Sequence, residues 1–320
     1  MASPGLTEIV TTTLRNRSKK SADAVSNNNA LLYRLKDKGN NRPFSGGRTI
    51  VDEIEYAANG TFQWFSGYET IDISPSDVFT AAEYEIKQAS VAVSMSGLEK
   101  LQNAGREQVI DLLEGRIKNA ERTMLNNLST GVYSDGTGSG GKQIGGLQLL
   151  VADTGLSTAG SISSTTWSFW RNQIYDFSSN SVTPSSATIQ TAMNTLFLNC
   201  SRNTDRPDLI VADNTYFRYY WESLQAIQRI SNDKMAAAGF ENLKFMGADV
   251  VFDGGQDGAA PSNHMFFLNT NYLKYRPHRD CNMTPSADRF STNQDAMVSL
   301  ILWAGNMTCS NRNLQGVIVA

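Results

Sequence analysis

A glycine-rich segment carries the most suggestive catalytic motif of the sequence. Residues 136–143 read Gly-Thr-Gly-Ser-Gly-Gly-Lys-Gln and differ at one position, the last, from the phosphate-binding loop Gly-x-x-x-x-Gly-Lys-Ser/Thr. That loop needs a hydroxyl after the lysine to hold magnesium, with a strand before it and a helix after it. Gln143 replaces the hydroxyl, and a long predicted helix precedes the loop. The segment therefore argues against nucleotide binding.

The two histidines, His264 and His278, are the next candidates for chemistry. Asp280 is placed to orient the imidazole of His278, and Cys281 is the nearest thiol, but no nucleophile motif such as Gly-x-Ser-x-Gly occurs. No glutamate or cysteine stands at metal-ligand spacing from either histidine. We therefore expect no catalytic residue, no metal site, no cofactor and no small-molecule substrate. An acid–base enzyme with a pocket near these residues is the alternative.

The composition indicates what class of protein this chain belongs to. Its 320 residues are 40% hydrophobic and 18% charged, which is enough apolar sequence for a sizeable core. No apolar run reaches the length of a membrane span, and residues 1–14 lack the pattern of a signal peptide. Three unpatterned cysteines favour a reducing compartment. We expect a chain that folds in a cytoplasm and has no membrane partner.

Charge is segregated along the chain. Residues 1–48 hold nine basic and three acidic residues, so the remainder is strongly acidic. This predicts a basic arm that meets something anionic or the acidic body of another copy, although a solvated helix face would give the same count. Two short helices are expected in the arm, with apolar faces formed by Leu6, Ile9, Val10 and Leu14 and by Leu31, Leu32 and Leu35.

A hairpin is predicted after the arm, because the apolar period changes to two. Ile50, Ile54 and Tyr56 share one strand face with Asp52 as the exception, and residues 71–73 alternate in a returning strand. The tip between them carries four aromatics, namely Phe62, Trp64, Phe65 and Tyr68. Bulky aromatics are costly to leave in water, so the tip must fold back or lie on a neighbour. Further strand is expected at 78–80 and 84–93.

The long helix is the strongest predicted element. Ser96 and Glu99 form a capping-box pattern, and an apolar stripe at helical spacing covers residues 106–130. An unbroken helix of that length is a rod of about 37 Å. Beyond the glycine-rich turn we expect a mixed region with helices at 189–198 and 214–230 and strands at 208–212, 248–252, 264–268, 296–304 and 314–319.

Opposite charges on the hairpin and the long helix suggest a contact between copies. Within 48–75 only Arg48 is basic, against the acids Asp52, Glu53, Glu55, Glu69 and Asp72. The helix offers Arg106, Arg116, Lys118 and Arg122. We expect the hairpin of one copy to lie on the helix of the next, a pairing that sets register more than affinity. Projecting elements that cannot bury their apolar residues within their own subunit imply contacts with other copies.

The order of these elements resembles a known family. An arm leads through Phe-Ser-Gly-Gly-Arg-Thr-Ile at 44–50 into an extended hairpin, and a strand ending in Val-Ala-Val-Ser-Met-Ser-Gly-Leu-Glu at 91–99 precedes the long helix. A glycine-rich turn ending in Ile-Gly-Gly-Leu at 144–147 opens the mixed region. Over essentially the whole chain this resembles the major capsid protein of a tailed bacteriophage, with the HK97-type fold.

The resemblance implies an α+β fold with four named parts. These are an N-terminal arm over 1–44, a hairpin called the E-loop over 45–75 that lies across the neighbouring subunit, a peripheral domain over 76–140 and 265–305 with a spine helix at 106–130, and an axial domain over 141–264 and 306–320.

The resemblance also implies a function and partners. The chain would be a structural subunit that self-assembles into hexamers and pentamers of an icosahedral capsid around double-stranded DNA. It would be assembled in the host bacterial cytoplasm, reside in the virion, and meet a portal protein and a separate scaffolding protein. The arm residues facing DNA or acidic neighbours would be Arg15, Arg17, Lys19 and Lys20. An encapsulin-like nanocompartment and a DNA-binding accessory protein are the alternatives.

Overall fold

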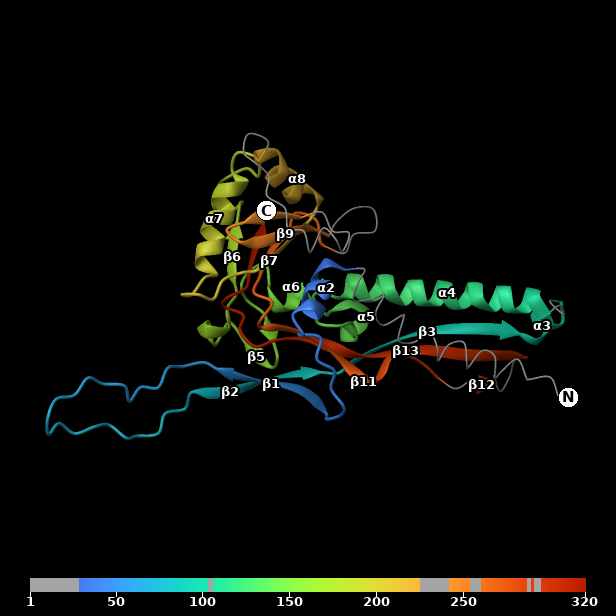
Figure 1. Ribbon diagram of the computed structural model, residues 1–320, viewed down its shortest axis with the longest axis horizontal. Helices are drawn as coiled ribbons and strands as arrows, with labels where there is room; N and C mark the ends of the chain where they lie inside the picture. The colour runs from blue at the N-terminus through green and yellow to red at the C-terminus, as the bar shows by residue number, and fades with distance from the viewer. Residues whose placement is uncertain (1–28, 103–105, 225–241, 254–259, 287–288, 291–294) are drawn as a thin grey trace.

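The computed structural model of the chain describes residues 29–102, 106–224, 242–253, 260–286, 289–290 and 295–320. Figure 1 shows three parts: an upper lobe built around a sheet, a rod that points to one side, and a long loop that reaches to the other. Helices and strands are mixed in an α+β arrangement, as predicted. No helix among the described residues is long and apolar enough to span a membrane.

The rod consists of one long helix lying along a sheet. Helix α4 (Arg106–Gly131) follows the short α3 (Gly97–Gln102) and packs on β3 (Lys87–Ser96). The predicted apolar stripe is confirmed where side chains are described, because Ile117, Ala120, Met124 and Leu128 are all buried. Strand β3 pairs with β13 (Ala296–Cys309), which also pairs with β11 (Leu273–Pro285) and β12 (Arg289–Phe290).

The predicted start of α3 is also confirmed. The backbone N–H of Ser96 donates to Glu99 Oε2 at 3.1 Å, and the N–H of Glu99 donates to Ser96 Oγ at 3.2 Å. This reciprocal pair is the capping box expected from the sequence.

The upper lobe is organised by a six-stranded sheet. Its order is β6 (Gln173–Asp176), β14 (Gly316–Val319), β10 (Met265–Leu268), β7 (Leu209–Ala212), β9 (Ala248–Phe252) and β8 (Asn242–Phe245). Every residue of β7 and β10 is buried, as continuous apolar strands covered on both faces must be. Helices α7 (Ile189–Asn199) and α8 (Asn214–Ser223) pack in this lobe.

Two apolar clusters meet across this sheet. Leu209 and Val211 of β7 belong to a core shared with the rod, whereas Ile210 and Ala212 belong to a second core under α7 and α8. The strand therefore joins the two parts, because successive side chains point to opposite faces.

Short elements connect these parts. They are α2 (Ala30–Asp37), α5 (Gly138–Gly141), α6 (Leu147–Leu150), the hairpin of β4 (Thr158–Ala159) and β5 (Ile162–Ser163), and the 3-10 turn η1 (Ser168–Trp170). The second predicted arm helix is confirmed as α2, which buries Leu31, Leu32 and Leu35 and is capped by the Asn29 side chain. The first predicted arm helix lies outside the described residues.

The predicted hairpin exists, but its returning strand was misplaced. Strand β1 (Thr49–Glu55) pairs with β2 (Phe79–Glu85), and residues 56–78 between them form the long loop of Figure 1 without regular strand. Ile71 and Ile73, predicted to lie in the returning strand, are instead exposed in that loop. Alternation alone does not make a strand there, because no described surface of the subunit covers their apolar face.

Candidate inter-subunit surfaces

The tip of the long loop projects from the described part of the subunit and exposes its aromatic side chains. Trp64 is 90% exposed, Phe62 is 75% exposed, and Phe65 and Tyr68 are likewise exposed. The aromatic contact at the tip is local, an edge-on pair of Phe62 and Trp64 with ring centroids 5.6 Å apart. Of the two outcomes expected from the sequence, folding back is therefore wrong, and the tip projects.

Short hydrogen bonds shape the tip. The Gln63 amide donates to the carbonyl of Thr70 across the loop at 3.0 Å, and the N–H of Ser66 donates to Glu69 Oε2 at 3.0 Å. Hydrogen bonds from the side chain and from the backbone N–H of Ser74 hold the pKa of the exposed Asp72 carboxyl below its usual value. Glu69 and Asp72 thus lie on the projecting loop, as predicted, and they also cap its turns.

The base of the loop is anchored to the body, and one predicted contact residue belongs to this anchor. Asp52 was expected to face a neighbouring subunit. It is instead buried, with Oδ1 2.8 Å from Lys274 Nζ and 3.3 Å from Arg276 on β11. Its inward place in the alternating strand and the two cations opposite explain the difference, since a buried carboxylate needs paired charge. Asp52 is not available to a second copy.

Further contacts fix the direction of the loop. The hydroxyl of Tyr84 donates to the carbonyl of Cys309 at 2.8 Å and accepts the N–H of the same residue. On β1's side, the Tyr56 ring stacks on Phe169 with centroids 5.4 Å apart. Glu83 donates its N–H to the carbonyl of Gly160 in the β4–β5 turn. The base is therefore held by β11, β13 and the upper lobe together.

The remaining predicted acids of the hairpin base are exposed. Glu53 and Glu55 are exposed on β1, in the alternation that buries Ile54 between them, and they border a groove that Arg202 and Asp205 also line. Their exposure is what a contact with another copy requires.

The predicted basic face of α4 is only partly available. Arg116 lies 2.6 Å from Glu99 Oε1 and donates to the carbonyl of Ser94, so it ties α4 to α3 and β3 within its own chain. The guanidinium and the Ser96 amide lower the pKa of Glu99 to about 2. Arg116 was expected to pair with a neighbouring copy, but it pairs with Glu99 of its own chain instead.

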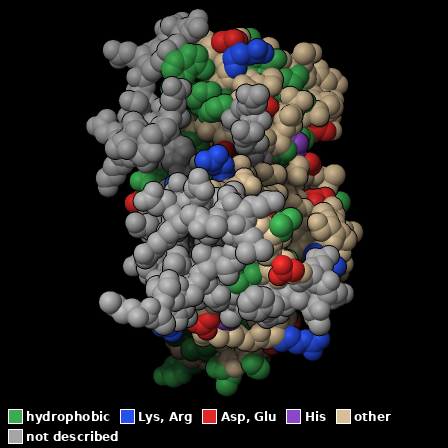
Figure 2. All heavy atoms as spheres, turned by 90° about the vertical axis from the view of Figure 1, so that its right-hand side faces the viewer, with side chains coloured by type: hydrophobic (Ala, Val, Ile, Leu, Met, Phe, Trp, Pro, Cys, Tyr) green, Lys and Arg blue, Asp and Glu red, His purple; other side chains and the backbone are tan. Residues whose placement is uncertain are grey.

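Two of the other three basic residues predicted on α4 have described side chains. Lys118 and Arg122 are exposed on α4, and the side chain of Arg106 lies outside the described residues. Viewed along the rod from the α3 end, the visible Lys and Arg side chains of the described residues stand apart and form no single patch (Figure 2). The predicted arm bases Arg15, Arg17, Lys19 and Lys20 also lie outside the described residues.

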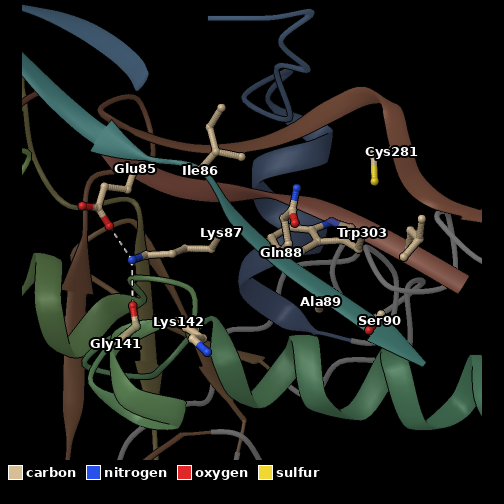
Figure 3. A pocket seen from close by; sticks show the side chains of 11 residues that line it. Glu85, Ile86, Lys87, Gln88, Ala89, Ser90, Gly141, Lys142, Cys281 and Trp303 are labelled. Atoms are coloured by element: carbon tan, nitrogen blue, oxygen red, sulfur yellow. Dashed lines mark hydrogen bonds and ion pairs between the residues drawn. The ribbon is translucent and has the colours of Figure 1, made fainter. Parts of the chain in front are cut away.

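The glycine-rich segment has the context expected for a connection and not for a phosphate loop. Its residues form the turn α5, in which Ser139 and Gly140 have left-handed backbone conformations, and α4 precedes it. Figure 3 shows the adjoining cleft of about 610 Å³, where Lys87 points to Glu85 and to the Gly141 carbonyl, each at 2.7 Å. Lys87 of β3 is therefore already bonded within the chain, whereas Lys142 of the motif itself is exposed.

The two histidines do not form a shared site. The ring of His264 lies 3.0 Å from Asp153 and 2.7 Å from the Ser262 carbonyl, whereas His278 packs edge-on against Phe44. Burial lowers the pKa of His264, but its two acceptors outweigh burial and raise the pKa above its ordinary value. Among the described residues, no group of three or more metal-ligating side chains gathers.

Sequence reasoning missed one buried cation. Arg312 is fully buried, and none of its partners among the described residues is a carboxylate. It donates to the Leu150 carbonyl and the Ser157 hydroxyl, each at 2.6 Å, and lies over the Trp170 ring. Desolvation lowers the pKa of its guanidinium. This residue joins α6 to the segment that leads into β4, and no local pattern around it signals such a role.

Comparison with solved structures decides the fold. The chain superposes on a subunit of the cyanophage A-1(L) capsid asymmetric unit with a TM-score of 0.65 at 14% identity, covering 88% of this chain and 91% of that one. The chain has the HK97-like capsid fold. The capsid of Myoviridae phage XM1 gives a TM-score of 0.53 at 11% identity over 89% and 91% of the two chains.

An encapsulin structure has a similar fold. A holo-encapsulin complex from Synechococcus elongatus gives a TM-score of 0.50 at 7% identity over 87% of this chain and 83% of that one. No family model and no curated protein matches the sequence. The predicted resemblance is therefore confirmed at the level of three-dimensional structure.

Proposed function

We propose that this chain is the major capsid subunit of a tailed bacteriophage, a structural protein that assembles into hexamers and pentamers of an icosahedral shell around double-stranded DNA. The observation that carries this is the HK97-like fold spanning most of the chain, with its higher TM-score on a phage capsid than on encapsulin. The function is mechanical: many modest contacts close into a shell with an avidity that no single pair has.

The geometry of the projecting loop supports the proposal. Residues 45–75, the proposed E-loop, leave from an anchored base and carry bare aromatics at the tip. In a solitary subunit this apolar surface stays in water, whereas a neighbour would bury it. We assign residues 76–140 and 265–305 to the peripheral domain, and 141–264 and 306–320 to the axial domain. Residues 1–44 form the arm.

The proposed partners follow from shell geometry. Each subunit would contact other copies, packaged DNA without sequence preference, a portal protein at one vertex and a separate scaffolding protein during assembly. Assembly would take place in the host cytoplasm and the mature protein would reside in the virion.

Electron microscopy of the purified full chain tests the proposal. We expect shells, capsomers or tubes that contain all of the protein at high concentration. A homogeneous monomer that persists at high concentration, measured by light scattering, would refute it. If the chain alone forms no closed shells, a second experiment with coexpressed candidate scaffolding proteins is required before that result is interpreted.

An encapsulin-like compartment is the second candidate, favoured by the match to the Synechococcus complex. Particles purified from cells after nuclease treatment distinguish the two. Protected double-stranded DNA supports the phage shell, and a stoichiometric protein cargo with no protected nucleic acid supports the compartment.

A further inference from the structure

The long loop between β1 and β2 contains the one Asn-Gly dipeptide of the sequence, Asn59–Gly60. Both residues are exposed, and they follow closely on Tyr56, whose N–H donates to the carbonyl of Val78 at 3.0 Å where the loop leaves the ribbon. Glycine has no Cβ, so a backbone nitrogen of glycine can approach the preceding side-chain amide with little steric hindrance. The dipeptide is therefore a place where the chain can react with itself.

The loop holds the Asn59 side chain by its amide oxygen. Oδ1 accepts the Thr61 N–H at 3.0 Å, the Thr61 hydroxyl at 2.8 Å and, from the opposite limb of the loop, the Ser76 hydroxyl at 3.2 Å. The first of these bonds closes an Asx turn. Donors on this oxygen make Cγ more electrophilic, and they stabilise negative charge that develops on Oδ1 during attack. Asn59 Cγ is thus an electrophile whose charge-stabilising groups are already in place.

The backbone nitrogen of Gly60 is the matching nucleophile. A short covalent tether joins it to Asn59 Cγ, which makes their reaction intramolecular. Among the described residues its N–H donates to no acceptor, so no hydrogen bond must break before it reacts. A Cβ built at Gly60 would meet no heavy atom within 4 Å. The surroundings therefore leave room for a five-membered ring to form.

We propose that Asn59 is a self-modification site, at which the folded loop converts asparagine to aspartate or isoaspartate. Hydroxide removes the proton of the Gly60 nitrogen, and this nitrogen forms a bond to Asn59 Cγ. The bond from Cγ to Nδ2 breaks, and ammonia leaves with a proton taken from water. Water then opens the cyclic imide: cleavage between the nitrogen and Cγ gives aspartate, and cleavage between the nitrogen and the backbone carbonyl carbon gives isoaspartate. Water is the only co-reactant.

The product alters the loop in two ways. Either product adds a negative charge, and isoaspartate also lengthens the backbone by one atom. The bond between Asn59 and Ser76 joins the two limbs of the loop, between its base and the bond of Gln63 to Thr70 nearer the tip. A longer backbone at this position changes the spacing of those contacts. This inference goes beyond the proposed shell function, and its chemistry does not depend on it.

Incubation of the folded full chain at neutral and mildly alkaline pH tests the proposal. Peptide mass spectrometry measures the exchange of the amide for an acid at Asn59, and enzymatic methylation of isoaspartate detects the isomer. We expect the reaction to speed up as the pH rises, and to run on the order of tenfold faster than at Asn203, an exposed asparagine followed by threonine. Equal rates at the two sites, or no reaction at Asn59, would overturn the proposal.

Variants of the loop separate the folded geometry from the dipeptide alone. Gly60→Ala adds a methyl group that the fold accommodates but that hinders attack, so most of the reaction should be lost. Ser76→Ala removes one donor and should slow the reaction about 2- to 10-fold, the factor that one neutral hydrogen bond supplies. Ser74→Ala is the matched control, because this hydroxyl lies on the same limb and bonds Asp72 instead; its rate at Asn59 should be unchanged.

All three substitutions lie on the exposed loop, so circular dichroism is expected to show folded chains. If Ser76→Ala reacts as fast as the natural chain, the folded loop does not assist the reaction and the proposal is wrong. The reaction and the shell are tested separately, because mass spectrometry also reads an unassembled chain. A chain that reacts at Asn59 but never forms shells would refute the proposed function alone, and a chain that forms shells without reacting would refute this inference alone.

Discussion

Truncating the exposed tryptophan of the loop separates the two roles that a projecting hairpin can have. Trp64 is 90% exposed, and its ring contact is with Phe62 on the same tip. Trp64→Ser therefore removes almost no packing from the subunit. We expect the free energy of unfolding to change by less than about 0.5 kcal/mol, as for surface substitutions in general.

The expected effect on assembly is far larger. An aromatic side chain covered by a neighbour buries about 150–250 Å², which at about 25 cal/mol per Å² is about 4–6 kcal/mol before the cost of association. Truncation of such an interface anchor costs about 2–4 kcal/mol in practice. The contact between two copies should then weaken roughly 30- to 1,000-fold, since 1.4 kcal/mol is about tenfold.

Light scattering against protein concentration measures how much the contact between copies weakens. Thermal unfolding of the unassembled subunit measures the change in the free energy of unfolding. Gln63→Ser is the matched control, because it removes the hydrogen bond across the tip but no large apolar surface. Assembly of the control should stay near that of the natural chain. If Trp64→Ser leaves assembly unchanged, the tip does not contact a neighbour. If it lowers unfolding free energy as much as assembly, the tip belongs to the subunit's own core.

Three further outcomes are expected from buried polar contacts. Asp52→Asn should cost about 3 kcal/mol of unfolding free energy because two cations lose their partner, whereas Glu53→Gln on the exposed face should cost less than about 0.5 kcal/mol in the same denaturation series. Arg312→Lys should cost about 2–4 kcal/mol, since an ammonium cannot reach all the acceptors of the guanidinium; an unchanged melting temperature would show that those bonds are not needed. The raised pKa of His264 means that the Asp153 contact stabilises fully below about pH 6.5 and weakens as pH rises through the folded value; His264→Phe should remove that loss from melting curves recorded at increasing pH.

The elements that sequence predicted well are those whose signal is local. Helix α4 follows from its apolar periodicity, strand β9 from a short apolar run, and the start of α3 from a capping box. Strand β11 was missed, because its pairing with β13 is irregular between Pro277 and Thr284 and its middle carries Arg279 and Asp280. A strand of that kind is defined by a partner far along the chain and not by its own alternation.

The candidate contact residues divide in the same way. The exposed aromatics were found because a tip between turn residues has nowhere local to bury them. Asp52 and Arg116 were misassigned, because charge alone does not reveal an intrachain partner. The cations that neutralise Asp52 lie 222 and 224 residues further along the chain, where Lys274 and Arg276 alternate with buried side chains of β11. That alternation is the signal that would have found them.

A buried ionic anchor at the base of a loop with a bare tip has a mechanical consequence. Asp52 holds β1 to β11, and Tyr84 holds β2 to β13, so the direction of the loop is set by the body before any partner arrives. The entropy of orienting the loop is then lost during folding and not during association, which favours tight contacts between rigid copies. Changes at the base should therefore act on assembly through direction, even though they touch no neighbour. Asp52→Asn is expected to lower both stability and assembly, in contrast to Trp64→Ser, which should lower assembly alone.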